Sequence, residues 1–478
     1  MAAIMRTTLG WRDRLVALSI LDQDALLYLL AAILALGTIL LGESADYRQW
    51  AEMAVGPYAV AVVLCWGAAR RRSRRVKRDG TASERDRLRN GVILGLLITV
   101  MLVPLGVEVV LRADHHPGDE VQNEVTVIEA GGDRVMNHKN CYLAHPKTIG
   151  GSVTSQSEDS FFPYLPGMCP FGLINATSGP AELKDARIPL TGFSLIVIGA
   201  ALLLAEVPSR RRWRLFQVVV VLPSGALPMV TGGDDLPVIA LMMLGLALAT
   251  RRRPVWSGLA IGLAGTLKFT AWPLLILLAL GEWDRRGRRA ILRYSFAVAA
   301  VAIPILGIGI GSNWHAFVTN AIKFPLGLTR VKSPAASPLL GQELVVLFPS
   351  VKPEIIALLG LVGLAAVAYG LKRWTPSSPQ SAAGFSGLAM LLATVLAPAT
   401  RFGYLIYPLD LLSCAVLFTP LALGAKGALA HDGHAQDASG ISNSLSVSPI
   451  AAEVCPSPAS EGEIDGLTGA TITPTSHS

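Results

Sequence analysis

The chain has 478 residues, of which 52% are hydrophobic and 16% charged, and its formal net charge is +7. This composition is too apolar for an ordinary soluble domain. Apolar runs of roughly bilayer-spanning length recur along nearly the whole sequence, which predicts an all-α polytopic membrane protein. The excess of positive charge would suit nucleic acid, but its distribution favours a different explanation.

The first 24 residues carry charges and no long apolar stretch, so we expect a cytoplasmic N-terminal segment, residues 1–24, and no cleaved signal peptide. A membrane domain, residues 25–423, follows with about 12 transmembrane or half-spanning helices. We expect these near residues 25–41, 53–69, 90–111, 190–206, 215–231, 236–249, 254–267, 269–281, 294–311, 353–371, 381–398 and 404–423.

Basic residues orient these spans. With the N-terminus inside, the inner segments hold 28 of the 41 Lys and Arg residues, and every short inner loop is basic. The run RRRSRRVKR at 70–78 is then a cytoplasmic loop beside anionic lipid rather than a nucleic-acid site. This predicts a multi-pass plasma-membrane protein with both termini cytoplasmic, the lipid bilayer as a partner and no nucleic acid.

Three hydrophilic regions remain. Two are extracytoplasmic loops, residues 112–188 and 312–352, and the third is a tail rich in Ser, Ala, Gly and Pro, residues 424–478, which we expect to be disordered and cytoplasmic. Cys141 and Cys169 share the large outer loop, the compartment that permits disulfides, so we expect them to be bonded; two free thiols are the alternative. No Cys or His spacing predicts a metal site.

The outer loop opens with several carboxylates. Apolar residues recur between Val121 and Val135 at helical spacing, which predicts a short amphipathic helix on the membrane surface. Glu124 lies on one face with Ile128, whereas Glu129 is turned away. A solvated acidic face and a catalytic carboxylate both remain open. The aromatic and proline-rich segment 159–173, which contains Tyr164, either anchors the loop at the interface or lines a cavity.

Asp234 and Asp235 lie in a tight turn between two predicted spans, at the outer side. Two interpretations are open for this pair. The carboxylates could cap the helix that follows, where negative charge is favoured. Alternatively, one of them could face the same cavity as Glu124.

Lys268 stands alone in an apolar stretch. Basic runs at 251–253 and 285–289 are both inside, so residues 254–281 form a short hairpin that goes out and returns, with Lys268 at its apex. Each arm is about 20 Å long at helical rise, less than the ~30 Å hydrocarbon core. Lys268 either snorkels to the surface or binds an anion inside the protein.

Arg401 follows an outer turn between the last two predicted spans, and Arg330 lies in the second outer loop. Both stand beside Pro, Gly and aromatic residues. They are candidates to bind a phosphate group at the outer surface, and solvated loop charges are the alternative for Arg330. Asp410 in the last span has no partner that the sequence identifies.

These residues resemble a known family, the GT-C type membrane glycosyltransferases, in particular glycosyltransferase family 87 and related actinobacterial mannosyltransferases. The resemblance covers roughly residues 90–410. It rests on Glu124 and the order of residues up to Cys141-Tyr142, on FFPYLPGM at 161–168, on GGDDLP at 232–237 and on the stretch around Lys268. Glu124 stands where the family usually has Asp, which leaves the base open between Glu124 and Glu129.

The resemblance implies transfer of a sugar, mannose in the related enzymes, from a polyprenyl-phosphate donor to a glycan or glycolipid acceptor on the extracytoplasmic face. We predict an inverting single displacement with Glu124 as the base, Glu129 as the runner-up, and Asp234 or Asp235 after it. A departing lipid phosphate needs fixed cations, and our candidates are Lys268 and Arg401, with Arg330 next. Asp234, Asp235, Tyr142 and Tyr164 would line the substrate cavity. We expect no cofactor and leave dependence on a divalent metal open.

A transporter or flippase of lipid-linked saccharides is the main alternative. It would carry charged groups at mid-depth within its spans and small outer loops. This chain instead has its polar residues in the outer loops, which favours an enzyme.

Overall fold

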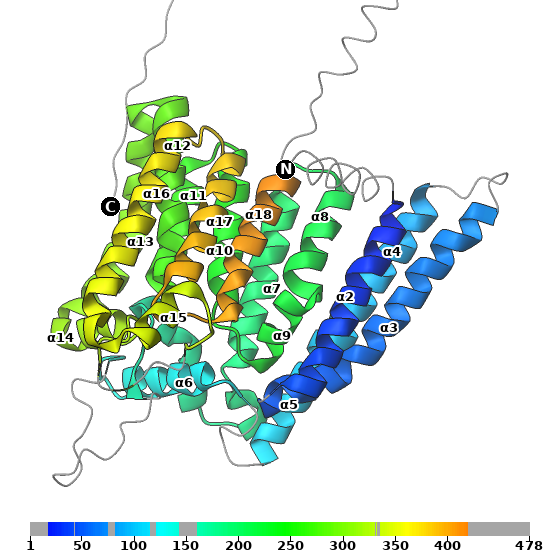
Figure 1. Cartoon of the computed structure of the whole chain (residues 1–478), viewed down its shortest axis with the longest axis horizontal. Coiled ribbons are helices and arrows are strands. Elements are labelled where there is room, and N and C mark those ends of the chain that lie inside the picture. The colour runs from blue at the N-terminus through cyan, green and yellow to red at the C-terminus, as the bar shows by residue number, and fades with distance from the viewer. Residues whose placement is uncertain are drawn as a thin grey trace, which may run out of the picture. The chain divides into compact units, whose positions relative to one another are not determined.

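The computed structural model of the chain describes residues 18–42, 44–74, 82–114, 121–142, 160–329, 331 and 335–418 (Figure 1). This part of the chain is helical, and extended pairing within it is limited to one bridge between Ala336 and Thr400. The all-α fold expected from the apolar runs is therefore confirmed. The predicted tail, residues 424–478, lies outside the described residues.

The first half of the chain contains α2 (Ile20–Leu41), α3 (Ala45–Arg74), α4 (Ala82–Leu96), η1 (Leu97–Leu102), α5 (Val103–Asp114), α6 (Asn123–Met136), η3 (Pro166–Ala176), η4 (Ala181–Lys184), α7 (Arg187–Leu204), α8 (Ser209–Phe216), η5 (Gln217–Val221) and α9 (Pro223–Thr231). The second half contains α10 (Leu236–Thr250), α11 (Pro254–Leu267), η6 (Phe269–Ala271), α12 (Trp272–Arg286), α13 (Arg288–Gly311), α14 (Trp314–Phe317), η7 (Val318–Lys323), α15 (Leu340–Leu347), η8 (Pro349–Val351), α16 (Lys352–Arg373), α17 (Pro379–Leu396), η9 (Phe402–Leu405) and α18 (Ile406–Leu417).

Each predicted span overlaps a helix or a broken helix. Among the described residues, seven helices are long and apolar enough to cross a membrane, and an eighth results if the pair Ser209–Val221 and Pro223–Thr231, bent by 44°, is one span. Three further apolar helices are shorter, at Leu236–Thr250, Pro254–Leu267 and Phe402–Leu417. The positions of the spans were thus predictable, whereas fewer helices reach full membrane length than the twelve segments expected.

The peripheral helices expose apolar side chains. On α13 the exposed residues include Phe296 and Ile308, and on α16 they include Leu361 and Leu364. Such a continuous apolar surface is unfavourable in water and is the surface that lipid covers. By contrast, α10 is buried nearly all round, which makes it the central helix of the bundle.

The predicted short hairpin is present. Its first arm, α11, has 14 residues and ends at Lys268, whose backbone is extended. The chain then turns through η6 into α12, and the Trp272 indole N–H donates to the Gly265 carbonyl at 3.0 Å across the apex. The second arm runs on to Arg286 instead of ending near 281, because Glu282 pairs with Arg286 and prolongs the helix by a turn.

The acidic segment of the first large loop forms α6, as its periodicity predicted. In Figure 1 this helix lies across one end of the bundle, which we call the α6 end. It buries its apolar face, including Val125 and Ile128, against protein. A Cβ atom on Gly172 of η3 would lie 1.9 Å from the Ile128 carbonyl oxygen, so only glycine permits this contact between the two backbones.

Candidate active site

Lys268 lies between two carboxylates. Its ammonium nitrogen is 2.5 Å from Asp234 Oδ2 and 2.5 Å from Asp235 Oδ1. The lysine side chain is 12% exposed, so it does not snorkel to the surface. Asp235 stands at the N-cap position of α10, yet its side chain makes no capping bond and instead also accepts a hydrogen bond from the Tyr407 hydroxyl at 2.7 Å. The side chains of Asp234 and Asp235 therefore pair with Lys268 and do not cap the helix.

The turn that carries the aspartates is packed against α6. Gly232 has a φ of +123°, a conformation that favours glycine, and a Cβ atom there would lie 2.1 Å from the Val125 side chain. Gln122, just before α6, donates from its backbone N–H to the Thr231 carbonyl at 3.1 Å and from its side chain to the Thr231 hydroxyl at 2.8 Å. These contacts bring the first turn of α6, with Glu124, next to the aspartates.

The aromatic segment of the loop covers the apex of the hairpin. The Leu165 backbone N–H donates to the Leu267 carbonyl at 3.0 Å, and the Lys268 ammonium lies 5.0 Å from the centre of the Tyr164 ring. The Tyr142 hydroxyl in turn donates to the Tyr164 carbonyl at 2.9 Å. Tyr142 and Tyr164 are both buried, so this segment lines the site from within the protein and is not an anchor at the lipid interface.

Arg401 forms an ion pair with Glu124. Their side chains are 30% and 19% exposed, which makes this pair the more accessible part of the site. Arg401 is positioned by its neighbour Thr400, whose backbone pairs with the second loop: the Thr400 N–H donates to the Ala335 carbonyl at 2.9 Å, and its carbonyl accepts from the Ser337 N–H at 2.8 Å. A residue 277 positions away in the sequence thus meets Glu124.

The site is electrostatically coupled. Burial raises the pKa of Asp234 to about 6, against the opposing effect of the Lys268 charge. Burial lowers the pKa of Lys268, but the charges of Asp234 and Asp235 outweigh it and hold that pKa above its ordinary value. The field of Glu124 also reaches Asp234, so the two ion-paired groups belong to one cluster. With three carboxylates and two cations, the cluster formed by Glu124, Asp234, Asp235, Lys268 and Arg401 has a formal charge of −1.

Glu129 belongs to a different cluster. Its two carboxylate oxygens accept from Arg112 at 2.8 and 2.6 Å, and Oε1 also accepts the Ala186 backbone N–H at 2.9 Å. Arg112 bonds in addition to Asp185, which is shared with Arg187. The carboxylate is buried, and its oxygens are already occupied by donors. This arrangement is that of a structural ion network.

Arg187 is the centre of that network. It is completely buried and donates to Glu108, to Asp185 and to the Val230 carbonyl. Sequence reasoning missed it, although a signal was present. Arg112 and Arg187 stand at the ends of predicted spans on the side where the positive-inside rule expects few cations, and such arginines need buried partners. The site tyrosine Tyr407 was likewise not singled out.

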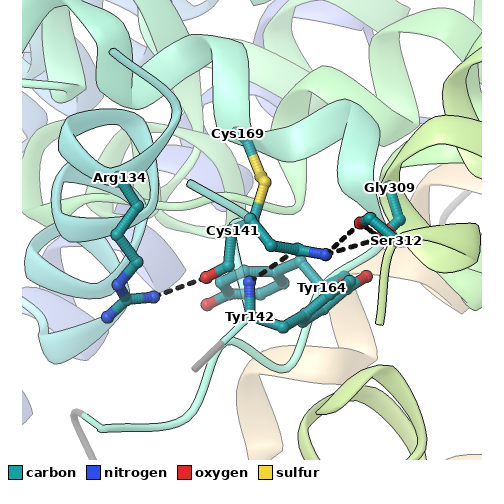
Figure 2. Close-up of a disulfide and its surroundings, with 8 residues drawn as sticks. Arg134, Cys141, Tyr142, Tyr164, Cys169, Gly309 and Ser312 are labelled. Carbon is teal, nitrogen blue, oxygen red and sulfur yellow. Dashed lines mark hydrogen bonds between the residues drawn. A yellow bond between two sulfur atoms is a disulfide. The ribbon is translucent and has the colours of Figure 1, made fainter. Parts of the chain in front are cut away.

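Cys141 and Cys169 form a disulfide, the pairing predicted from their shared loop (Figure 2). It links the chain that leaves α6 to η3. Around it, Arg134 donates to the Cys141 carbonyl at 2.5 Å, and Asn140 donates to the Gly309 carbonyl of α13 at 3.0 Å. Tyr142 follows Cys141 directly and donates to the Tyr164 carbonyl (Figure 2), so the disulfide holds the segment that covers Lys268.

We expect the variant Cys141→Ser to unfold at a lower temperature than the wild type and to lose activity. The bond closes a loop of 28 residues, which in a chain-entropy estimate contributes about 3–4 kcal/mol. Thermal unfolding with and without reductant is the measurement. Reductant should lower the midpoint of the wild type and leave that of the variant unchanged. An unchanged wild-type midpoint, with thiol labelling reporting full reduction, would contradict the prediction.

Other predicted residues have different outcomes. Arg330 lies outside the described residues. Asp410 is buried in α18 and has neither a hydrogen bond nor an ion pair within the described part of the chain. Among those residues, no group of three or more His, Cys, Asp or Glu side chains is arranged to hold a metal ion.

The apolar helices and the ion-paired cluster define a polytopic membrane protein with a charged, partly accessible site at the α6 end of its bundle. Residues 168–398 match the model of glycosyltransferase family 87. This is the family that the sequence resemblance named, and the match covers a little less than half of the chain. It contains Asp234, Asp235 and Lys268, whereas Glu124 and Arg401 lie outside it on either side.

Two crystal structures of ArnT from Cupriavidus metallidurans are similar to the chain. The structure bound to undecaprenyl phosphate has a TM-score of 0.45 and 16% sequence identity, and the match covers 73% of this chain and 64% of that chain. The apo structure has a TM-score of 0.42 and 15% identity, and the match covers 73% and 63%. The chain thus spans less than two thirds of the length of ArnT. Comparison with curated proteins gives no match.

Proposed function

We propose that the chain is an integral membrane glycosyltransferase that moves a sugar, mannose in our proposal, from a polyprenyl-phosphate donor to a glycan or glycolipid acceptor. One observation supports this proposal above the others. Residues from four separated segments meet in a single cluster: Glu124, the Asp234-Asp235 turn, Lys268 and Arg401. Carboxylates beside fixed cations are the groups that activate a hydroxyl and bind a departing phosphate. We place this end of the bundle on the extracytoplasmic side of the plasma membrane, because the opposite loops carry most of the Lys and Arg residues.

Glu124 is the base in our proposal. It is partly exposed and held by one cation, so an acceptor hydroxyl can reach its second oxygen. Glu129 was the other candidate, but its oxygens are occupied by Arg112 and a backbone N–H, which leaves it no room for a substrate. Asp234 is the second choice, because its raised pKa makes it a better proton acceptor near neutral pH.

Arg401 is the first candidate for the donor phosphate. It is the more exposed cation of the site, and its pairing with Glu124 uses one nitrogen of a guanidinium that has five N–H donors. Lys268 is already neutralised by two aspartates. It therefore acts first as a positioning residue for the carboxylates, and contacts phosphate only if the donor displaces one of them.

The reaction in this arrangement is a single displacement. Glu124 accepts the proton of the acceptor hydroxyl. At the same time the hydroxyl oxygen of the acceptor attacks the anomeric carbon of the donor sugar. The bond from that carbon to the phosphate oxygen breaks on the opposite face, so the configuration is inverted. The electron pair remains on the polyprenyl phosphate, whose developing charge Arg401 stabilises.

Purified protein in lipid nanodiscs tests this proposal. Polyprenyl-phosphate mannose, polyprenyl-phosphate glucose and polyprenyl-phosphate arabinose are supplied separately with oligosaccharide and glycolipid acceptors. The expected result is labelled product together with free polyprenyl phosphate, with mannose as the preferred sugar. If product forms only from another sugar, mannose is rejected as the donor sugar, and the proposed glycosyltransferase activity is retained. Translocation of intact donor across a proteoliposome, with no bond cleaved, would identify a flippase instead.

The rate of transfer should fall as the pH drops from 7 to 5. Because the pKa of Asp234 is raised to about 6, this carboxyl is ionised at pH 7 and protonated at pH 5, where Lys268 loses one ion-pair partner. The measurement is kcat/KM against pH. The variant Asp234→Asn should be slow and lack the step near pH 6, and Glu182→Gln, an exposed acid of the same loop, should retain it. A flat wild-type profile over this interval would contradict the prediction.

A further inference from the structure

A second charged site lies at the other end of the bundle. A cavity of about 500 Å³ opens there between the ends of several helices. The lining residues that matter for its chemistry are Arg252, Arg285, Arg286, Thr250, Gln380 and Phe418. No part of the proposed transferase mechanism uses them.

Two helices separate this cavity from the candidate active site. Helix α10 begins next to Asp235 and ends at Thr250, and α11 begins after Arg253 and ends next to Lys268. With 15 and 14 residues, these helices are about 22 and 21 Å long. The cavity is therefore a distinct site, remote from the cluster at the α6 end.

Cations exceed anions around the cavity. Arg285 and Arg286 share a single buried carboxylate, that of Glu282, at 3.0 and 3.1 Å. Glu206, the acid that lines the cavity, lies 3.7 Å from Arg251. In addition, the Arg285 Nε atom is buried and has no hydrogen-bond partner in the described part of the chain. A buried donor without a partner is costly, and an anion in the cavity would satisfy it.

Arg252 is a third arginine in the lining of the cavity. Its side chain has no hydrogen bond or ion pair within the described residues, and its backbone φ is +58°. This position follows the end of α10, where a left-handed residue is usually glycine. An arginine there accepts a backbone strain of about 1 kcal/mol, and it is one of the residues that line the cavity. The rest of the lining, including Ala205, Val207 and Phe418, is apolar.

We propose that this cavity binds the phosphate group of an anionic phospholipid, with the guanidinium groups of Arg252, Arg285 and Arg286 around the phosphate and the apolar wall beside the glycerol and the first acyl carbons. Arginine suits this role because its planar group donates two parallel hydrogen bonds to a phosphate. The cavity lies at the ends of membrane-length helices, including α7 and α17, which is the depth of lipid headgroups. A soluble phosphate compound carries the same recognition chemistry.

Delipidated protein in neutral detergent tests this proposal by native mass spectrometry with dioctanoyl phosphatidylglycerol. We expect saturable binding by the wild type and at least about tenfold weaker binding by Arg252→Glu, the fold-change expected for losing one charged hydrogen-bonding group. Since Arg252 has no hydrogen-bond or ion-pair partner among the described residues, this variant should remain folded. The matched control is Arg289→Glu, an exposed arginine of the same end that does not line the cavity.

The possible outcomes separate the alternatives. If inorganic phosphate displaces the lipid at equal concentration, the site binds a soluble phosphate compound. The phospholipid is then rejected as the ligand, and the binding of a phosphate group by the arginines is retained. Dioctanoyl phosphatidylcholine, which has no net charge, should bind more weakly. Equal binding by the wild type and Arg252→Glu would overturn the proposal. Equal loss of lipid binding in Arg252→Glu and Arg289→Glu would also overturn the proposal, because lipid binding would then depend on the overall surface charge and not on the cavity.

Discussion

The variant Glu124→Gln should retain its fold and lose sugar transfer by a factor of about 10²–10⁴, the usual contribution of a general base. The amide has the shape of the carboxylate and can still accept a hydrogen bond from Arg401, but it cannot take a proton from the acceptor. Loss of the counter-charge is tolerable, because the Arg401 side chain is 30% exposed. The measurement is single-turnover transfer from polyprenyl-phosphate mannose, with the thermal midpoint of each protein determined in parallel.

Two controls make this result specific. Glu182→Gln changes an exposed acid of the same loop and should leave the rate unchanged. Glu129→Gln should lower stability, because it weakens the pair with Arg112, while the protein that remains folded keeps its turnover. If Glu124→Gln is within twofold of the wild type and Asp234→Asn is inactive at every pH, the base is Asp234. If Glu129→Gln is stable and inactive, our assignment of its network as structural is wrong.

Replacement of Arg187 by Met should cost about 3–5 kcal/mol of stability, the usual penalty for removing one partner of a buried ion network. The arginine is completely buried and satisfies Glu108 and Asp185 at once. Without it, Glu108 loses its ion pair with Arg187, and Arg112 has to neutralise both Asp185 and Glu129. The yield of monodisperse protein and the thermal midpoint in detergent measure the effect.

The same substitution at an exposed ion pair provides the control. Arg210 pairs with Asp86 at 3.0 Å, but their side chains are 51% and 34% exposed, so Arg210→Met should cost less than about 1 kcal/mol. Arg187→Lys, which keeps the charge and loses the planar fork, should fall between the two. Equal midpoints for Arg187→Met and Arg210→Met would show that the buried network does not hold the loop to the bundle.

The positions of the helices were predictable because each depends on local sequence. Apolar runs must become helices in a membrane, where every backbone polar group needs an internal partner. Basic runs on both sides of residues 254–281 required a short hairpin, and this placed Lys268 at an apex. The disulfide was also predictable, since Cys141 and Cys169 share one loop of the kind that permits oxidation.

The partners of the charged residues were not predictable in the same way. Periodicity separated Glu124 from Glu129 on the α6 helix but could not assign a role to either. That assignment depends on Arg401, which is 277 residues away, and on Arg112, which lies in another span. From the local sequence, Asp234 and Asp235 could cap the helix that follows them. Their pairing with Lys268 depends on the packing of the hairpin against their turn, which the local sequence does not specify.

The sequence by itself determined an all-α membrane protein, the approximate place of each helix and a small set of candidate residues, because hydropathy and charge act locally along the chain. Only the tertiary structure decided which carboxylate is accessible and which is buried in a structural network. A buried charge must find a partner wherever the packing of helices brings one. In this chain the packing of the helices pairs Glu129 with Arg112, Glu124 with Arg401, and Lys268 with Asp234 and Asp235.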